Sequence, residues 1–549
     1  MTRYLQCMAL LGFAILSPRW ILVQGDTGAA HEQPPTRPWM PTPKQLPAVA
    51  WTTCQSHVIH GPYRSIQVNA DRRGCNILGD AANEPSIAVD PTDPRKIVIG
   101  WRQFDTVESD FRQAGWAYSH DGGHTWVFPG SVTPGVFGTD PVLAAGPTGE
   151  IYYLSINFDG MRLFSSFDGA VTWATRVQVS PGFLDKPWMT VDTTCYGGRG
   201  NIYIANDESF FRSTDGGATF FGGHVRDWVH FPAMHVDSSG SLLVTGVEGC
   251  LYVSYSVQNA SELAIFFKYG CASCPHVGGS RALVEGPNYS GLLGQSWIET
   301  YSDTIRGTYA VYLVNHCAYP FTDVTFSKSR DAGVTWTEAV RVHDDPIDSG
   351  AWQWFGMMSV APNGRIDVVW NDTRNHLDAP NANLSELYYA FSTDAGETWS
   401  PNVQVSPVFD SQIGYPYGSP KLGDYYHMVS DNLGVNVAYA ATFNGEQDVY
   451  FLRIGAWDCN GNQVRDEDDI AATRSRDCNG NAVPDECEYR GDADGDGLTT
   501  LADFTTFVGD LVGPTASPAR PCAELSDADH DGDVDLHDFY LLEHVFAGR

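Results

Sequence analysis

The strongest chemical signal in the sequence is a pair of acidic loops near the C-terminus. In each loop aspartates occupy positions 1, 3, 5 and 12, and a glycine, Gly497 or Gly532, occupies position 6. The aspartates are Asp492, Asp494, Asp496 and Asp503 in the first loop and Asp527, Asp529, Asp531 and Asp538 in the second. Hard cations prefer oxygen ligands at this spacing, and the glycine permits the sharp turn of an EF-hand loop. The spacing therefore predicts two Ca²⁺ sites, with Ca²⁺ as the expected cofactor.

Each acidic loop continues into an amphipathic stretch, 501–511 after the first loop and 536–546 after the second. These stretches predict two short helices, and the repulsion among the loop carboxylates predicts that folding depends on the metal. With Asp in place of Glu at position 12, the segment 491–549 resembles a dockerin module. The resemblance implies attachment to a cohesin-like protein or another cell-surface partner.

A second acidic repeat precedes this module, in residues 457–490. The phrase Asp-Cys-Asn-Gly-Asn begins at Asp458 and again at Asp477, so oxygen-bearing side chains alternate along both copies. Such alternation suits a hard cation. The copies resemble the calcium-binding segments of thrombospondin type 3 repeats, and a polar linker remains the alternative interpretation.

An eight-residue phrase organises the larger part of the chain. It reads Ser-x-Asp-x-Gly-x-Thr-Trp in outline and recurs at 119–126, 166–173, 213–220, 329–336 and 392–399, with small variations. The aspartate can accept hydrogen bonds from the turn, glycine takes positive φ, and Thr-Trp suits the start of a strand. The phrase resembles the Asp box, or BNR repeat, of sialidase-like β-propellers. The resemblance implies an all-β fold with each box at a turn on the face away from any active site.

The strands around these boxes recur in units of two apolar strands followed by further strands. Seven such units fit between residues 83 and 454, at about 53 residues each, which suits four-stranded propeller blades. The sequence thus predicts a seven-bladed propeller over 63–456, with the strand 65–69 completing the last blade. Six blades remain the alternative if the fourth unit is an insertion, and the sialidases of this family have six.

Strand direction then predicts which side chains meet at the mouth of the ring, opposite the boxes. The expected ligand-binding residues are Arg102, Asp140, Lys186, Asp207, Trp354, Asp372, Arg374, Lys421 and Asp424. The expected catalytic residues are Glu84, Asp105, Tyr425 and Tyr426. A polar funnel with aromatic platforms such as Trp354 suits a sugar. Satisfied polar residues around a wet channel are the alternative interpretation.

The resemblance to sialidases implies a tyrosine nucleophile assisted by glutamate, an aspartate acid/base and three arginines that hold a carboxylate. Asn83-Glu84-Pro85 stands where the family has Arg-Ile-Pro, so the first arginine is missing. Asp105 has the place of the acid/base, and the pairing of Tyr425 or Tyr426 with Glu84 is a geometric guess. The main hypothesis is an exported sialidase-like glycoside hydrolase acting on extracellular glycans. A non-catalytic glycan-binding or cell-surface scaffold protein is the alternative.

Charge and the N-terminal residues narrow the possible partners and location. The formal net charge of −33 argues against nucleic acid or an anionic membrane surface as a partner. Arg3 and the apolar run 4–16 predict a signal peptide within 1–30, followed by a proline-rich linker over 31–62. Arg19 ends the run too early for a transmembrane span. We therefore expect a secreted or cell-surface protein.

Overall fold

The computed structural model describes residues 57–488, 501–514, 526–527 and 532–540. Within the first range it leaves out 183, 196, 225–231, 238–239, 246–249, 257–262, 272–285, 289–290, 304–307, 319–321, 332–334, 348, 380–381 and 479. The expected signal peptide and most of the expected linker lie outside the described residues. No helix among the described residues is both long and apolar enough to cross a membrane.

The described residues form seven antiparallel sheets, six of them from strands consecutive in sequence. The first three are β3 (Ala81–Val89), β4 (Ile97–Phe104), β5 (Gln113–Ser119), β6 (Val127–Ser131); β7 (Thr139–Ala145), β8 (Ile151–Asn157), β9 (Gly160–Ser166), β10 (Thr175–Pro181); and β11 (Trp188–Val191), β12 (Ile202–Ala205), β13 (Ser209–Ser213), β14 (Phe221–His224). The next two are β15 (Ala233–Val236), β16 (Ser241–Thr245), β17 (Cys250–Ser256), β18 (Leu263–Cys271); and β19 (Trp297–Asp303), β20 (Thr308–Ala318), β21 (Thr322–Ser329), β22 (Val340–Arg341). The sixth is β23 (Gln353–Val360), β24 (Ile366–Asp372), β25 (Leu384–Ser392), β26 (Val403–Gln404), with β27 (Phe409–Asp410) also on β25.

The seventh sheet joins the two ends of this region. It contains β28 (His427–Ser430), β29 (Gly434–Ala441) and β30 (Asp448–Gly455), and then β2 (Tyr63–Gln67) and β1 (His57–His60) from the beginning of the chain. In the β2–β30 pair Ser65 lies opposite Leu452. The predicted closure by the early strand is therefore confirmed, and β1 shows that the sheet begins inside the range expected to be linker.

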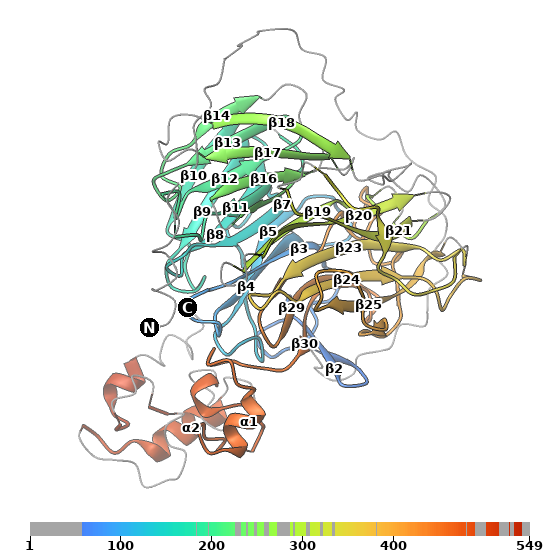
Figure 1. The fold of residues 1–549 in the computed structure, drawn as a ribbon. Coiled ribbons are helices and arrows are strands. Elements are labelled where there is room, and N and C mark those ends of the chain that lie inside the picture. Colours follow the sequence, from blue (N-terminus) through green and yellow to red (C-terminus); the bar gives the residue numbers. More distant parts are fainter. Residues whose placement is uncertain are drawn as a thin grey trace.

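The innermost strands form a closed circle of contacts. Each first strand packs against the next, from β3 through β7, β11, β15, β19, β23 and β28, and β28 packs against β3 again. In Figure 1 the blue strand β3 accordingly lies beside the orange strand β29. This arrangement is a β-propeller, as the repeats predicted. The fourth unit, β15–β18, forms a sheet of its own between the sheets of β11 and β19.

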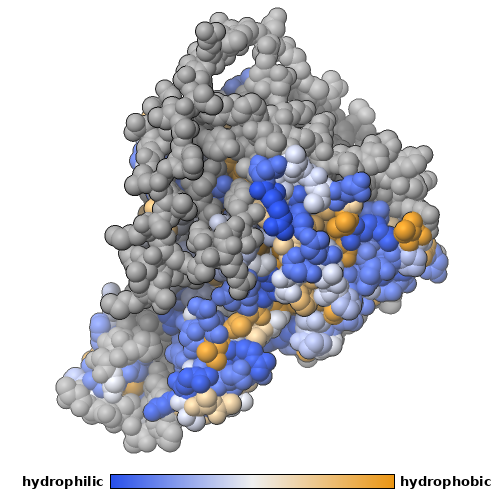
Figure 2. Space-filling model, viewed as in Figure 1, coloured by the Kyte–Doolittle hydropathy of each residue, from blue (hydrophilic) through white to orange (hydrophobic). Residues whose placement is uncertain are grey.

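The sheets bury side chains on both faces because each is packed between two others. Val98, Ile99 and Trp101 on β4 and Val437 and Tyr439 on β29 are fully buried. Runs of β-branched and aromatic residues suit such two-sided burial. Outside this core, Figure 2 shows hydrophilic residues over most of the described surface in that view, with hydrophobic residues in small separate groups.

Each Asp box fastens the turn between the third and fourth strands of its sheet. In the first box the Ser119 hydroxyl donates to Asp121 at 2.6 Å, and the Thr125 N–H donates to the same carboxylate at 3.0 Å. The same two bonds recur in the other four boxes. Gly123 has φ +98°, and a Cβ there would lie 2.4 Å from the Phe451 ring of the seventh sheet. The box therefore fixes both its own turn and the contact with the preceding sheet.

The segment after the ring is folded against the box face of the first sheet. Trp457 stacks on His124 with ring centroids 4.0 Å apart, and Arg95 donates to the carbonyl of Glu486 at 3.0 Å. A disulfide joins Cys459 to Cys487 across α1 (Asp466–Ala471) and a 3₁₀ helix (Asp485–Cys487). The described part of this segment is therefore folded against the ring, and its expected calcium binding stays a prediction.

Only parts of the C-terminal module lie within the described residues. Asp492, Asp494, Asp496, Asp529 and Asp531 lie outside them. The described part contains α2 (Leu501–Asp510), on which Asp503 is buried, and a helical turn at 536–540. The Gly532 N–H donates to Asp527 at 2.9 Å, and carboxylate oxygens of Asp533, Asp535 and Asp538 lie within 4.8 Å of one another.

Candidate functional site at the centre of the ring

Three consecutive sheets begin with a charged residue in a strained backbone conformation. Glu84, Asp140 and Lys186 have φ values of +54°, +50° and +53°, and each precedes a proline. Non-glycine residues avoid positive φ, and residues before proline are restricted further. At Glu84 and Asp140 the strand also shifts register by a β-bulge, which re-aims side chains. Strain of about 1–3 kcal/mol per residue is typical of functional positions.

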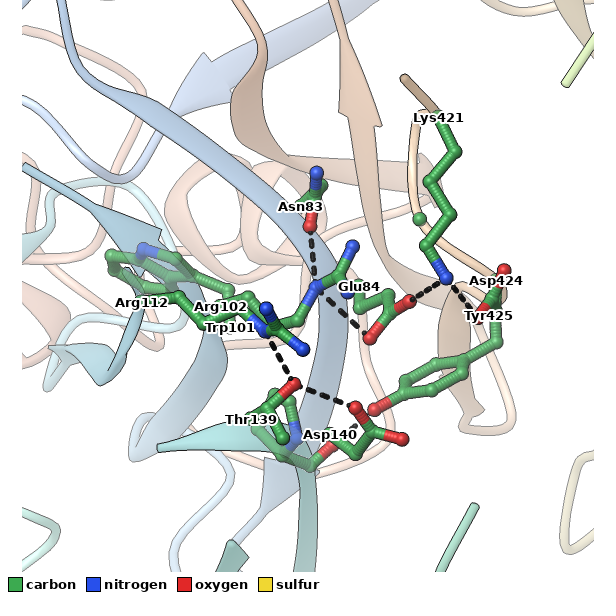
Figure 3. A network of polar contacts seen from close by, with 12 residues as sticks. Asn83, Glu84, Trp101, Arg102, Arg112, Thr139, Asp140, Lys421, Asp424 and Tyr425 are labelled. Atoms are coloured by element: carbon green, nitrogen blue, oxygen red, sulfur yellow. Dashed lines mark hydrogen bonds and ion pairs between the residues drawn. The ribbon is translucent and has the colours of Figure 1, made fainter. Parts of the chain in front are cut away.

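These residues meet in what we call the central ionic cluster: Glu84, Arg102, Asp140, Lys186, Lys421 and Asp424. Figure 3 labels all of its members except Lys186, and Asp140 and Asp424 lie on opposite sides of Tyr425. Glu84 pairs with Arg102 at 3.1 Å and with Lys421 at 3.7 Å.

Asp424 joins the two lysines of the cluster. Lys421 lies 2.5 Å from Asp424, Lys186 also pairs with Asp424, and Lys186 lies 3.7 Å from Asp140. Each carboxylate of the central ionic cluster therefore has a cation beside it.

Burial and charge set the protonation of the cluster. Burial raises the pKa of Glu84 to about 6, although Arg102 beside it acts in the opposite direction. Burial would also raise the pKa of Asp140, but Lys186 and Arg102 outweigh it and bring that pKa to about 2. The two lysines hold the pKa of Asp424 well below its usual range, against the effect of burial. Glu84 is thus the carboxylate that can exchange a proton near neutral pH.

Tyr425 also belongs to this centre, whereas Tyr426 does not. The Tyr425 hydroxyl donates to the carbonyl of Pro141 at 2.9 Å, and burial, then Glu84 and Asp140, raise the pKa of Tyr425 well above its usual value. The Tyr426 hydroxyl donates to the carbonyl of Ala440 at 2.5 Å, inside its own sheet. Of the two tyrosines expected beside Glu84, the structure brings only Tyr425 there.

Two arginines carry N–H groups that are not used within the described structure. Arg102 donates through Nε to Asn83 at 2.8 Å, but its buried Nη2 has no hydrogen-bond acceptor. Arg112 donates through Nε to the Thr139 hydroxyl at 2.9 Å, and that hydroxyl donates to Asp140 at 2.7 Å. Arg112 and Thr139 were not among the expected site residues.

A segment of the chain covers the cluster. The Leu292 N–H donates to Asp424 at 3.0 Å, and Asn288 binds the carbonyl of Gly423 at 2.8 Å and the N–H of Leu422 at 2.9 Å. Leu292 and Asn288 are themselves buried. The cluster is therefore closed off from bulk water on the side of this segment.

Several expected site residues outside the central ionic cluster are held by contacts of their own. Asp105 is exposed and accepts a hydrogen bond from Gln113 at 2.7 Å. Asp372 accepts from the Trp370 ring N–H at 2.8 Å, and Arg374 pairs with Asp372 and with Asp344. The Asp207 N–H reaches the carbonyl of Asp185 at 3.5 Å.

The expected aromatic platforms at the mouth are wrong. Trp101, Trp354, Tyr425 and Tyr426 are all buried, and the Trp354 ring N–H donates to Ser385 at 3.0 Å. The reason is that inner strands pack against neighbouring sheets on both sides, so large rings fill the space between sheets. One sequence pattern could have identified the cluster. A charged residue directly before a proline stands at the start of three successive sheets.

Beyond the central ionic cluster the inner strands enclose a cavity of about 220 Å³. Trp188, Trp297 and His427 are among the residues that line it, and the His427 ring stacks on Trp297 at 5.6 Å. Burial lowers the pKa of His427 to about 4, so this ring is neutral at physiological pH. The ring centre thus combines an ionic end with an aromatic interior.

Comparison with known proteins assigns the chain to no family. No protein-family model matches the chain, and no curated protein matches it. Among solved structures, the phage phi92 endosialidase shares 10% identity over 72% of this chain and 69% of its own, with a TM-score of 0.40. A protein of unknown function from Dyadobacter fermentans shares 13% identity over 71% and 97%, with a TM-score of 0.39.

The leech intramolecular trans-sialidase shares 10% identity over 63% of this chain and 69% of its own, with a TM-score of 0.37. The closed circle of inner strands and the five fastened boxes are what identify the chain as a β-propeller.

Proposed function

We propose that the chain is an exported, carbohydrate-active propeller of seven blades, and that it acts as a sialidase-like glycoside hydrolase. The observation that supports this most is the meeting of Glu84 and Tyr425 with Arg102 at the ring centre. A tyrosine is a suitable nucleophile when a carboxylate beside it takes the phenolic proton. Glu84, with its pKa near 6, is suited to that proton transfer.

In the proposed reaction the Tyr425 oxygen attacks the anomeric carbon while Glu84 accepts the phenolic proton. Asp105 donates a proton to the departing oxygen, and it later removes one from the water that releases the sugar. The sugar must reach Tyr425 from the mouth, so the cover formed by Asn288 and Leu292 has to move aside. The exposed position of Asp105 suits a group that exchanges protons with solvent.

Sialosides should be poor substrates of this site. Asn83 stands at the position of the first family arginine, and Arg102 is already paired with Glu84. A sugar carboxylate would have to compete with that internal carboxylate for the guanidinium.

A non-catalytic glycan-binding or scaffold role is the second candidate. It is favoured by the burial and internal ion pairing of the central ionic cluster, which would then serve only to hold the inner strands together. Under this hypothesis glycans bind at the mouth without being cleaved.

A screen of the purified protein against aryl glycosides, including a sialoside, distinguishes the two. The hydrolase hypothesis predicts cleavage of at least one glycoside, loss of that activity in Tyr425→Phe and Glu84→Gln, and little activity on the sialoside. Binding on a glycan array without cleavage of any glycoside would favour the second candidate. Absence of both would contradict a carbohydrate function.

We further propose that the C-terminal acidic loops bind two Ca²⁺ ions and attach the protein to a cohesin-like or cell-surface partner. Asp527 accepting the Gly532 N–H, with φ +93° at that glycine, is the turn expected of such a loop. Calorimetry of the full chain with Ca²⁺ should show binding that Asp527→Asn and Asp538→Asn weaken. The Cys459, Asp466 and Cys487 group offers no such site, since its cysteines form a disulfide.

A further inference from the structure

Three phenylalanines form a partly exposed surface on the face of the ring that carries the mouth. We call this surface, made of Phe111, Phe137 and Phe158, the aromatic platform. They come from the β4–β5 loop, the β6–β7 connection and the β8–β9 turn. Phe158 stacks on Phe137 with centroids 4.1 Å apart and planes 17° apart, and Phe111 meets Phe137 at 6.2 Å.

The outer rings of the platform are open to solvent although they are held in place. Phe158 is 72% exposed and Phe111 is 40% exposed, whereas Phe137 beneath them is 8% exposed. An exposed phenylalanine at a turn contributes little to the hydrophobic core. A ring already ordered by stacking, however, loses little conformational freedom when a ligand binds it.

Arg112 places a hydrogen-bond donor beside these rings. Its guanidinium lies 5.0 Å from the centroid of the Phe137 ring, and its Nε and Nη1 donate to Thr139 at 2.9 Å and to the carbonyl of Asp110 at 3.3 Å. Its Nη2 makes no hydrogen bond to any residue in the described ranges. One edge of a well-held guanidinium is therefore available to a ligand.

The platform is continuous with the central ionic cluster. Arg112 binds the Thr139 hydroxyl, which donates to Asp140 of that cluster at 2.7 Å. A ligand chain that lies on the platform would therefore extend toward the ring centre.

We propose that the aromatic platform and Arg112 form a subsite for a neutral sugar residue of the glycan, which rests on the proposed carbohydrate function. The C–H face of a pyranose packs on an exposed aromatic ring, and the free guanidinium edge donates to its hydroxyls. Asp110 lies directly beside Phe111 in the chain, and the protein carries a net charge of −33. Both oppose a polyanionic ligand at this place.

The test compares Phe158→Ala with Phe167→Ala. Phe167 is 70% exposed at the other end of β9, in the Asp box of the opposite face, so it is a matched control. An array of neutral oligosaccharides, with sialylated and uronic-acid glycans beside them, identifies the ligands of the wild-type protein. Calorimetry with the best of them then gives Kd for each variant.

We expect a neutral oligosaccharide to bind, and Phe158→Ala to raise its Kd at least tenfold while Phe167→Ala leaves it unchanged. Phe158→Trp should keep the affinity, and Arg112→Gln should weaken it. Equal affinities of wild type and Phe158→Ala for a bound glycan would overturn the subsite but leave the proposed function standing. A preference for sialylated or uronic-acid glycans would overturn the proposal that the subsite takes a neutral sugar. If no glycan binds at all, or if a protein ligand binds in a Phe158-dependent manner instead, both the subsite and the proposed carbohydrate function are overturned.

Discussion

The Asp-box turns and the central ionic cluster both depend on aspartates, but the partners of these aspartates lie at very different distances along the chain. Asp121 binds Ser119 and Thr125, two and four residues away. Asp424 pairs with Lys186, 238 residues away. A turn can therefore form as soon as its own eight residues exist, whereas the cluster exists only once the ring is complete. The Asp-box turn is therefore determined by a short local sequence, whereas the cluster is determined by residues from distant parts of the chain.

The largest effect should come from breaking the cluster at its shared carboxylate. Asp424→Asn leaves Lys186 with only Asp140 and Lys421 with only Glu84, each at 3.7 Å, and breaking a buried ion pair costs about 3–5 kcal/mol. Asp121→Asn in the first box should cost about 1–2 kcal/mol, since it removes only local hydrogen bonds. Guanidinium unfolding of both variants measures the difference. An equal loss of stability in the two variants would show that the long-range ion pairs contribute no more to stability than the local turns do.

The next effect concerns a second long-range contact, a carboxyl pair where the ring closes. Asn69 donates to Asp448 at 2.6 Å across the junction, and Gln103 donates to Asp80 at 2.9 Å. Burial, with the neighbouring acids, raises the pKa of Asp80 to about 8 and that of Asp448 to about 7. The folded state thus holds protons that the unfolded chain releases near pH 4.

The stability that these protons provide is therefore present at low pH and is lost as pH rises toward 8. We expect about 1.4 kcal/mol of lost stability per pH unit for each carboxyl protonated only in the folded state. Thermal unfolding at pH 5, 6, 7 and 8 measures the slope, and Asp80→Asn should flatten it. A stability that rises over this range in wild type would contradict the shared burial of the two acids.

A smaller effect should follow from Gly123→Ala in the first box. The new methyl group would lie 2.4 Å from the Phe451 ring and the residue would keep a positive φ, so we expect a loss of about 1–3 kcal/mol. Gly130→Ala is the control, because it has φ +118° but no atom within 4 Å of the added carbon. Chemical denaturation separates packing from backbone strain. Equal losses of stability in the two variants would mean that the contact between the sheets at Gly123 contributes nothing to stability.

The smallest effect on stability should come from Asp105→Asn at the mouth. Asp105 is exposed, so the melting temperature should change by no more than about 1–2 °C. Any glycosidase activity found in the screen should nevertheless be lost, because the proposed proton donor is gone. A variant that melts much lower would identify Asp105 as structural, and one that keeps full activity would remove it from the reaction.

Much of the ring could be predicted because its signals are local. The five boxes, the unit length and the early strand that pairs with β30 all follow from patterns within a few tens of residues. The expected mouth also brought together Glu84, Arg102, Asp140, Lys186, Lys421 and Asp424, because strand direction decides which residues open a sheet.

The remainder of the site depends on side-chain packing that patterns do not reveal. Trp354 and Tyr426 have the residue types of a sugar platform, but both fill space between sheets. Phe158 follows a strand and belongs to no distinguishing motif. Its ring forms part of a surface only because it stacks on the ring of Phe137. Arg374 ends its strand as Arg102 does, yet Asp372 and Asp344 hold it away from the centre.

The pairing of β2 with β30 also determines when this protein can finish folding. Asn69 and Val449 are hydrogen bonded although 380 residues separate them, so the strand made first must wait for nearly the last strand of the ring. Closing so long a loop is slow compared with forming a hairpin. Until that moment β30 presents an unpaired edge that another chain could join. A ring of this design is therefore most vulnerable to misassembly just before its completion.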